Sequence, residues 1–240
     1  MRNAARVIVI EQPNYVPWIG TFDLFDRADV CVFYDCVQYT KRDWRNRNRL
    51  NVSGATRWIT VPVKTSGLYH QRIRDVTIDY EREWVGQHLN TFHHSLGRAP
   101  FYEPVRALYA AALERRTPLL ADLSIELSTE IARYLGLRTT FVRSSTLPGV
   151  AGRKNERLLS VCDQFDCGVY LSGPAARSYL DARMFAERGY RVRYIVYDYG
   201  TYDREGTPSV PVLSILDVLC HLGPAGTLEF MRQRRRYEDG

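Results

Sequence analysis

The chain has 240 residues, 45% hydrophobic and 25% charged, which is long and apolar enough to bury a substantial core as a soluble protein. No apolar stretch approaches the roughly 18 residues that a membrane-spanning helix needs, and the apolar run at 7–10 is too short for a signal peptide, so we expect a cytoplasmic protein without membrane partners. The net charge is +6, but four arginines crowd into the last nine residues, and the remaining excess is too weak and scattered to indicate nucleic-acid binding.

The amino-terminal part of the chain predicts a strand, a helix and a second strand. Residues 6–11 and 30–34 are short apolar runs, as expected of strands buried on both faces, and residues 21–28 predict the helix between them. The carboxyl ends of parallel strands meet at one edge of a sheet. We therefore expect Gln12 and Asp35, which follow the two runs, to lie at the same edge if the crossover is regular.

A hairpin and a long helical segment come next. Residues 47–52 and 57–63 are predicted to pair across Ser53-Gly54-Ala55, and residues 73–78 to add another strand. From residue 81 to about 137 the pattern is amphipathic and helical, with breaks at Gly and Pro. We interpret this segment as a helical insertion or lid packed on the sheet.

The carboxyl-terminal half alternates strands and helices again. In chain order we predict strand, helix, strand, strand and helix at residues 139–142, 155–165, 169–171, 191–197 and 213–221. A long loop at 199–211 separates the last two, and residues 231–240 are expected to be a flexible arginine-rich tail outside a single domain of residues 1–230. Together these elements predict an α/β fold with a mostly parallel sheet flanked by helices, a β-hairpin and a helical insertion or lid.

The stretch at 30–48 turns abruptly from apolar to polar where its strand ends, and open α/β sheets bind ligands at that edge. Asp35 is either a general base or ligand-orienting carboxylate, or a structural partner of Lys41 or a nearby arginine. Cys36 is either a nucleophile, whose thiolate Lys41 and Arg42 would favour, or a small semi-buried side chain. Lys41 is a catalytic candidate that would neutralise negative charge on the ligand or negative charge that develops during the reaction. The side chains expected to bind a polar or anionic substrate are Gln38, Trp44, Arg45, Asn46, Arg47 and Asn48.

Aromatic side chains interleave with these amides. Pro13 and Pro17 fix φ and lack amide donors, so the loop between them is stiff and displays Tyr15 and Trp18. Together with Trp44 they either stack a sugar, a nucleobase or an acyl carrier arm, or pack in the core. Their mixture with amide side chains, Gln12 included, favours a binding wall, because buried amides need partners that a ligand can supply.

Two candidates lie elsewhere in the chain. His88 stands among aromatic residues on a helical face and either acts as a base or packs as a buried histidine. Ser172 and Gly173 end a predicted strand directly before Pro174, a favoured first helical residue. The amides at this helix start either form an anion pocket or make an ordinary turn.

Absent motifs narrow the chemistry. There is no Walker-type Gly-x-x-x-x-Gly-Lys run and no Gly-x-Gly-x-x-Gly fingerprint, so classical ATP or NAD binding is disfavoured and the cofactor stays open. A Gly-x-Ser-x-Gly elbow is also missing, which argues against an ordinary serine hydrolase. The five cysteines are odd in number and lack zinc-ribbon spacings, and no His-Glu-x-x-His run occurs, so we expect reduced thiols and no metal site. The cysteines are Cys31, Cys36, Cys162, Cys167 and Cys220.

Three motifs resemble the WbqC-like protein family over about residues 7 to 223. They are Gln12 to Gly20 (QPNYVPWIG), Asp35 to Asn48 (DCVQYTKRDWRNRN), and Tyr170 to Ala176 with Tyr179 to Asp181 (YLSGPAA and YLD). The family is associated with bacterial polysaccharide and natural-product gene clusters, so the resemblance implies a role in such a pathway. At Cys36 we expect many relatives to have an acidic or small polar residue, and the resemblance therefore carries over no thiol mechanism.

Three functions fit these features. The first is a group-transfer enzyme, in which an acyl or aminoacyl group passes from a small-molecule or carrier-protein thioester to an amine, with Asp35 as base and Cys36 as acyl acceptor. The second is a nucleotide-dependent adenylyl or sugar-nucleotide transferase that holds phosphates at the Pro13 to Gly20 loop and at Ser172-Gly173. The third is a non-catalytic module that binds RNA or an acidic carrier protein. The sequence leaves the oligomeric state open.

Overall fold

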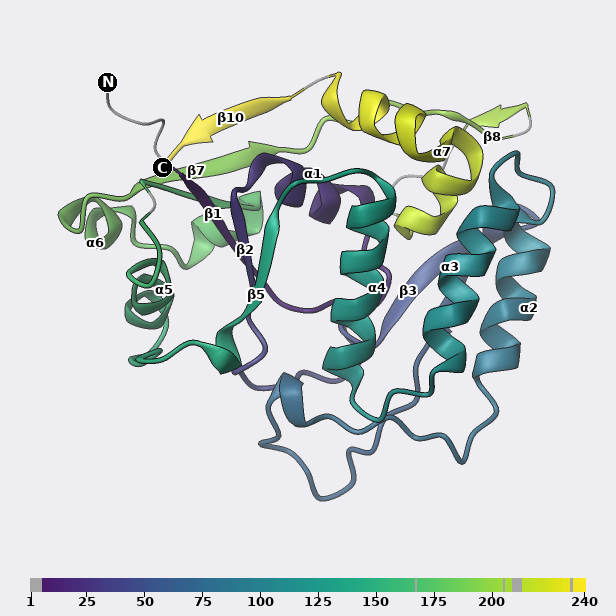
Figure 1. Ribbon diagram of the computed structural model, residues 1–240, viewed down its shortest axis with the longest axis horizontal. Coiled ribbons are helices and arrows are strands. Elements are labelled where there is room, and N and C mark those ends of the chain that lie inside the picture. Colours follow the sequence, from purple (N-terminus) through teal and green to yellow (C-terminus); the bar gives the residue numbers. More distant parts are fainter. Residues whose placement is uncertain (1–5, 167, 205, 209–212, 234) are drawn as a thin grey trace.

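The computed structural model describes residues 6–166, 168–204, 206–208, 213–233 and 235–240. Its centre is a six-stranded sheet in the order β10-β7-β6-β1-β2-β5 (Figure 1). The strands are β1 Val7–Glu11, β2 Val30–Phe33, β5 Thr140–Arg143, β6 Val169–Ser172, β7 Arg191–Val196 and β10 Arg236–Asp239. All neighbours pair in parallel except β10, which runs antiparallel to β7. The predicted α/β fold with a mostly parallel sheet is confirmed.

Helices cover both faces of this sheet, because its central strands are apolar on both sides. In β1, Val9 belongs to the core that α1 and α7 share, whereas Ile8 and Ile10 belong to a second core with α5 and α6. Successive strand side chains point to opposite faces, so one strand contributes to both cores. The helices are α1 Ile19–Arg27, α2 Val85–Leu96, α3 Tyr102–Glu114, α4 Leu120–Tyr134, α5 Asn155–Cys162, α6 Ala182–Glu187 and α7 Ile215–Arg232.

The hairpin and the helical segment form a block beside the sheet (Figure 1). Strands β3 Arg47–Val52 and β4 Ala55–Thr60 are joined by a tight turn, in which Ser53 and Gly54 have φ values of 51° and 80°. Both positive values are those of the turn that matches the twist of a two-residue hairpin. Helix α2 packs against β3, and α3 packs against α2, α4 and α7. The predicted hairpin and helical insertion are therefore present, with the turn one residue shorter than expected.

Two sequence expectations are wrong in detail. The region predicted as a strand at 73–78 begins instead with a short 3-10 helix, η1 Ile73–Asp75, followed by isolated bridges from Thr77 to Leu119 and from Ile78 to Val63. Its β-branched residues are buried by neighbouring segments without a continuous ladder partner. A propensity for strand produces a strand only where another strand is available to pair with it.

The carboxyl terminus also differs from the expected flexible tail. Residues 236–239 form β10, because β7 would otherwise be an edge strand with unpaired backbone groups. Helix α7 continues well beyond the predicted end at 221, across a kink at Gly223, whose φ is 63°. A Cβ at Gly223 would approach the Phe101 ring to 2.6 Å, so glycine permits both the kink and this close packing. The loop predicted at 199–211 contains the short strands β8 Asp203–Arg204 and β9 Thr207–Pro208, and the rest of it lies partly outside the described residues.

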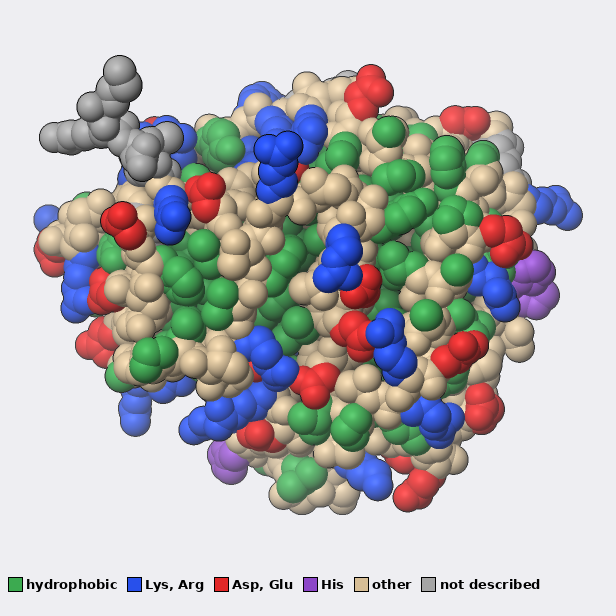
Figure 2. Space-filling model, in the orientation of Figure 1, with side chains coloured by type: hydrophobic (Ala, Val, Ile, Leu, Met, Phe, Trp, Pro, Cys, Tyr) green, Lys and Arg blue, Asp and Glu red, His purple; other side chains and the backbone are tan. Residues whose placement is uncertain are grey.

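In the part of the chain that the structure describes, no helix combines the length and the apolar character needed to cross a membrane. On the face shown in Figure 2, basic and acidic side chains are interspersed and do not gather into one basic stripe. Cys31, Cys36, Cys162 and Cys220 are buried and form no disulfide within the described structure, whereas Cys167 lies outside the described residues.

Candidate active site

Two adjoining cavities open at the carboxyl ends of β1 and β6. They have volumes of about 720 and 390 Å³. The chain leaves β1 through α1 toward β2 on one side, and β6 enters from α5 on the other side, so the order of the strands reverses between β1 and β6. In open α/β sheets this reversal is the place where ligands bind. Both cavities are lined by Glu11, Asn14, Trp44, Gly173 and Ala175.

Glu11 is the last residue of β1, and its half-buried carboxyl lines both cavities. Burial raises the pKa of this carboxyl from 4.5 to about 7, while the positive charge of Arg45 opposes the rise. A group with this pKa is populated in both protonation states at neutral pH. Such a carboxyl is suited to act as a general acid or base.

Two loops that are distant in sequence meet at Glu11. Arg45, from the loop before β3, donates to the side chains of Gln12 and Asp43. The Tyr15 amide also donates to the Trp44 carbonyl at 3.1 Å, which joins the backbones of the two loops. The expected convergence of the loop after β1 with the polar stretch after β2 is therefore present. It leaves the Arg45 guanidinium oriented at the edge of the larger cavity.

Lys154 reaches the larger cavity from the residue before α5. Its φ of 48° and ψ of −122° lie in a region that L-residues rarely adopt, which costs about 1–3 kcal/mol and is most often found at functional positions. Among the described residues, Lys154 has no ion-pair partner. It therefore offers the cavity a positive charge that is not already neutralised.

Aromatic side chains form the walls of the two cavities, and a glycine lies at their floor. Trp44 and Tyr179 are partly exposed large aromatic residues beside the larger cavity. Trp18 lines the smaller cavity and packs edge to face on Tyr197, with ring centroids 4.7 Å apart. At Gly173 a Cβ would lie 3.1 Å from the Tyr197 hydroxyl, so a larger residue would crowd this floor.

A helix starts at Pro174 as predicted, and Ser172 and Gly173 before it both line the larger cavity. The segment that follows is η3 Pro174–Ser178, a 3-10 helix of five residues. Such a short segment lacks the aligned amides and the dipole of a full α-helix.

The contacts of Asp35 fit the alternative interpretation, a structural carboxylate, with the distant Arg143 as its partner in place of Lys41. Its side chain is fully buried, and it lines neither cavity. The Arg143 Nε and the Ser145 Oγ donate to Asp35 Oδ2 at 2.8 and 2.7 Å, and the Ser144 Oγ and the Ser145 amide donate to Oδ1 at 3.0 and 2.9 Å. Four donors saturate a carboxylate. Asp35 therefore joins the end of β2 to the end of β5 and has no lone pair directed at a substrate.

Cys36, Lys41 and Gln38 lie on the same loop but outside both cavities. Cys36 is buried, and its amide lies 3.4 Å from the Ser144 hydroxyl. The exposed Lys41 and Gln38 side chains donate to the backbone carbonyls of Thr65 and Tyr69, at 3.4 and 3.0 Å. These contacts fasten the loop to the segment before η1, and the geometry gives the proposed thiol nucleophile no access to the cleft.

His88 and Tyr15 form a buried network behind the cleft. The His88 Nε2 lies 3.2 Å from the Thr60 carbonyl, which can only accept, so this nitrogen carries the hydrogen. The Tyr15 hydroxyl then donates to Nδ1 at 2.9 Å and accepts from Tyr109 at 2.6 Å. Burial lowers the pKa of His88 to about 4, so the imidazole stays neutral near pH 7. The network connects α2, α3 and the Pro13 to Pro17 loop, and neither side chain reaches a cavity.

Asn46, Arg47 and Asn48 mainly hold backbone and aromatic groups in place. Asn46 Nδ2 donates to the Val61 carbonyl at 2.9 Å, and the Arg47 guanidinium lies 4.2 Å from the centre of the Trp58 ring. Asn48 lines the smaller cavity, and its Nδ2 donates to the Val16 carbonyl at 2.9 Å. Val16 has a φ of 37°, unusual for a β-branched residue, and this bond stabilises that strained conformation beside the site.

The predicted site residues therefore separate into two groups. Those that line a cavity are Gln12, Trp18, Trp44, Arg45, Asn48, Ser172 and Gly173. Those that lie elsewhere are Tyr15, Asp35, Cys36, Gln38, Lys41, Asn46, Arg47 and His88. Sequence reasoning missed Glu11, Asn14, Lys154 and Tyr179. An acidic residue that ends an otherwise apolar strand, directly before Gln12, was the available signal for Glu11.

The predicted helical insertion does not cover this site. None of the described residues of 81–137 lines either cavity. The segment is therefore a packed insertion and does not form a lid over this cleft. Among the residues that the structure describes, no group of three or more His, Cys, Asp or Glu side chains is arranged to hold a metal ion.

The fold and the site define an α/β protein whose cleft, at the switch point of a mainly parallel sheet, combines aromatic side chains with a few charged groups. The chain belongs to the WbqC-like protein family, whose model matches residues 12–229. It is also similar to the uncharacterized protein Rv1507c of Mycobacterium tuberculosis (strain ATCC 25618 / H37Rv), with 38% identity over 231 residues, covering 95% of this chain and 99% of that protein. No solved structure matches the chain.

Proposed function

We propose that this protein is a group-transfer enzyme of polysaccharide or secondary-metabolite biosynthesis, which passes an acyl or aminoacyl group to an amine. The pathway context is implied by the family resemblance. The observation that carries the proposed chemistry is the Glu11 carboxyl, whose pKa burial raises to about 7 at the ligand-binding edge of the sheet. Glu11 takes the role of base that the sequence assigned to Asp35.

In the proposed reaction the Glu11 carboxylate accepts a proton from the amine as the nitrogen lone pair forms a bond to the acyl carbon. The carbonyl π electrons move onto oxygen, and the cations of Arg45 and Lys154 stabilise the negative charge. When that charge re-forms the carbonyl, the bond to the thiol leaving group breaks, and Glu11 returns its proton to the departing sulfur. Transfer is direct, so Cys36 has no covalent role.

A nucleotide-dependent transferase is the second candidate. Lys154 supplies an unneutralised positive charge, and Trp44 and Tyr179 supply flat aromatic faces beside it. Phosphates and a nucleobase would use these groups without a Walker loop. On the face shown in Figure 2 the charges are mixed, and that face gives no comparable support to an RNA-binding module.

The test begins with a thermal-shift screen of the full chain against acyl thioesters, amino acids, nucleotides and nucleotide sugars. The variants are Glu11→Gln and Lys154→Ala, with Glu187→Gln as a matched control because Glu187 is exposed on α6, outside both cavities. A stabilising thioester is then incubated with amines, and the amide product is measured by mass spectrometry.

We expect a thioester to stabilise the wild type and Glu11→Gln alike, whereas turnover falls by about 10²- to 10⁴-fold in Glu11→Gln, falls in Lys154→Ala as well, and is unchanged in Glu187→Gln. Full turnover in Glu11→Gln would remove Glu11 from the mechanism. Stabilisation by nucleotides alone, weakened in Lys154→Ala, would favour the second candidate. Ligand binding at this cleft without turnover of any acceptor would contradict both transferase proposals and would favour a non-catalytic binding module.

A further inference from the structure

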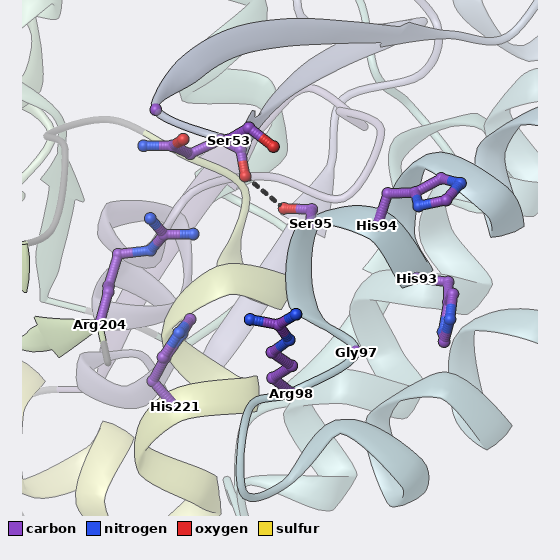
Figure 3. Close-up of a pocket in the computed structure, with 10 residues that line it drawn as sticks. Ser53, His93, His94, Ser95, Gly97, Arg98, Arg204 and His221 are labelled. Carbon is purple, nitrogen blue, oxygen red and sulfur yellow. Dashed lines mark hydrogen bonds between the residues drawn. The ribbon is translucent and has the colours of Figure 1, made fainter. Parts of the chain in front are cut away.

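Another cavity, of about 560 Å³, lies away from the candidate active site (Figure 3). It is formed by the tip of the β3–β4 hairpin, the end of α2, β8 and α7, and it shares no described lining residue with the two cavities at the switch point. Its volume falls within the roughly 300–1,000 Å³ of small-molecule sites. The cavity is therefore large enough for a ligand of its own.

The described residues that line this cavity include cationic and imidazole side chains and no acidic one. Figure 3 shows Arg98, Arg204 and His221 pointing toward one common space from three different elements. His93 and His94 also line the cavity, but in the same view their rings turn away from that space. The converging groups would attract an anion.

Two of these three groups are fixed by Asp217, which lies behind them. The Arg204 Nε donates to Asp217 Oδ1 at 2.9 Å, and this bond holds the guanidinium at the cavity. The His221 Nδ1 lies 2.7 Å from the Asp217 carbonyl, which can only accept, so Nδ1 carries a hydrogen and Nε2 donates to an anion when the ring is an imidazolium. The side chain of His221 is only 5% exposed, so its orientation is well constrained.

Asp217 neutralises only part of the positive charge. Its carboxylate is fully buried and also accepts from the Tyr202 hydroxyl at 2.6 Å. Arg98 is exposed and has no ion-pair partner among the described residues. An anion in the cavity would therefore meet at least one uncompensated guanidinium beside two preoriented groups.

The β3–β4 hairpin contributes to this cavity an acceptor that lacks a donor. Asn51 is 5% exposed, and its Oδ1 has no hydrogen-bond partner in the described structure. The Asn51 carbonyl accepts from the Ser95 hydroxyl at 2.7 Å, which fixes the hairpin against α2. A buried acceptor without a donor is costly, and a ligand hydroxyl would satisfy it.

We propose that this cavity binds a phosphorylated polyol, such as a hexose phosphate. The phosphate lies among Arg98, Arg204 and His221, and a hydroxyl donates to Asn51 Oδ1. This site is separate from the cleft at Glu11 and does not depend on the reaction proposed there.

Isothermal titration calorimetry on the full chain tests the site with glucose 1-phosphate, inorganic phosphate and unphosphorylated glucose as probes. The informative variants are Arg98→Glu, which reverses the uncompensated charge, and Asn51→Ala, which removes the acceptor. Arg183→Glu on α6 is the matched control for an exposed arginine, and Lys154→Ala reports binding in the other cleft.

We expect saturable binding of glucose 1-phosphate, weakened roughly tenfold to a hundredfold by Arg98→Glu and unchanged by Arg183→Glu and Lys154→Ala. Asn51→Ala should reduce the preference for glucose 1-phosphate over inorganic phosphate. The proposal is overturned by the absence of saturable binding, by equal binding of glucose, or by a loss of affinity in Lys154→Ala in place of Arg98→Glu.

Discussion

Replacing Asp35 by asparagine distinguishes a structural carboxylate from a catalytic one. The Asp35 side chain is 0% exposed and accepts four hydrogen bonds. Asparagine keeps one acceptor oxygen, so the two bonds to Oδ2, from Arg143 and from the Ser145 hydroxyl, are lost. The amide that replaces Oδ2 also directs its own hydrogens at the Arg143 guanidinium.

The expected cost follows from these contacts. A hydrogen bond to a charged group contributes about 1.5–3 kcal/mol. The lower end applies here, because the Arg143 side chain is 30% exposed and retains its bond to Asp122. Two lost bonds therefore lower the free energy of unfolding by about 3 kcal/mol. In a chain of this size, that corresponds to a fall in Tm of roughly 6–12 °C.

Urea unfolding followed by circular dichroism measures this change, with calorimetry for Tm. Asp122→Asn is the matched control, because Asp122 contacts the same arginine but its side chain is 34% exposed, and we expect it to cost less than about 1 kcal/mol. A stability of Asp35→Asn within about 0.5 kcal/mol of the wild type, combined with lost turnover, would refute the structural role and return Asp35 to catalysis.

Three further predictions concern titration and the carboxyl terminus. The Glu11 carboxyl should titrate near pH 7 in carbon-detected NMR. Because its pKa is higher in the folded than in the unfolded state, the wild type should lose stability as pH rises from about 4.5 to 7. Glu11→Gln lacks this loss, so its stability relative to the wild type should increase over the same range. A constant difference in stability between the two proteins would contradict the raised pKa. The pKa of His88 is instead lowered to about 4, so the unfolded chain takes up a proton first. Wild-type stability should therefore fall between about pH 6.5 and 4 more steeply than that of His88→Gln, and parallel curves would argue against a neutral buried imidazole. Deleting residues 235–240 removes β10 and the ion pair of Arg235 with Asp23, at 3.0 Å, and should cost on the order of 2 kcal/mol in urea unfolding; an unchanged midpoint would show that β10 adds no stability.

Local pattern was sufficient for most elements of the fold. The runs that form β1 and β2 are apolar except for Glu11 at the end of β1, and the helix between them begins and ends within two residues of its predicted bounds. A continuous apolar run indicates a strand that is buried on both faces. A strand-helix-strand order with a regular crossover then dictates a parallel pair. The sequence alone therefore determined the fold class and the edge at which a ligand site should lie.

Elements that depend on a distant partner were not predictable in this way. The strand at 236–239 exists because β7 offers it an unpaired edge, whereas residues 73–78 make only isolated bridges, to Val63 and Leu119, and form no continuous ladder. The charged and polar residues at the terminus predicted a segment exposed to solvent without regular structure. It forms a strand instead, because it pairs with β7 about forty residues away.

The roles of the acidic residues were also decided by tertiary structure. Glu11 ends β1 and Asp35 follows the end of β2 by two residues, at the same edge of the sheet, and nothing local distinguishes a catalytic carboxyl from a structural one. Arg143, Ser144 and Ser145 arrive at Asp35 from more than a hundred residues away and saturate it, whereas Glu11 faces a cavity in which burial raises its pKa. The sequence placed a carboxylate at this edge, but only the surrounding donors and the degree of burial determine what that carboxylate does, because protonation and hydrogen bonding depend on neighbours that the fold brings together.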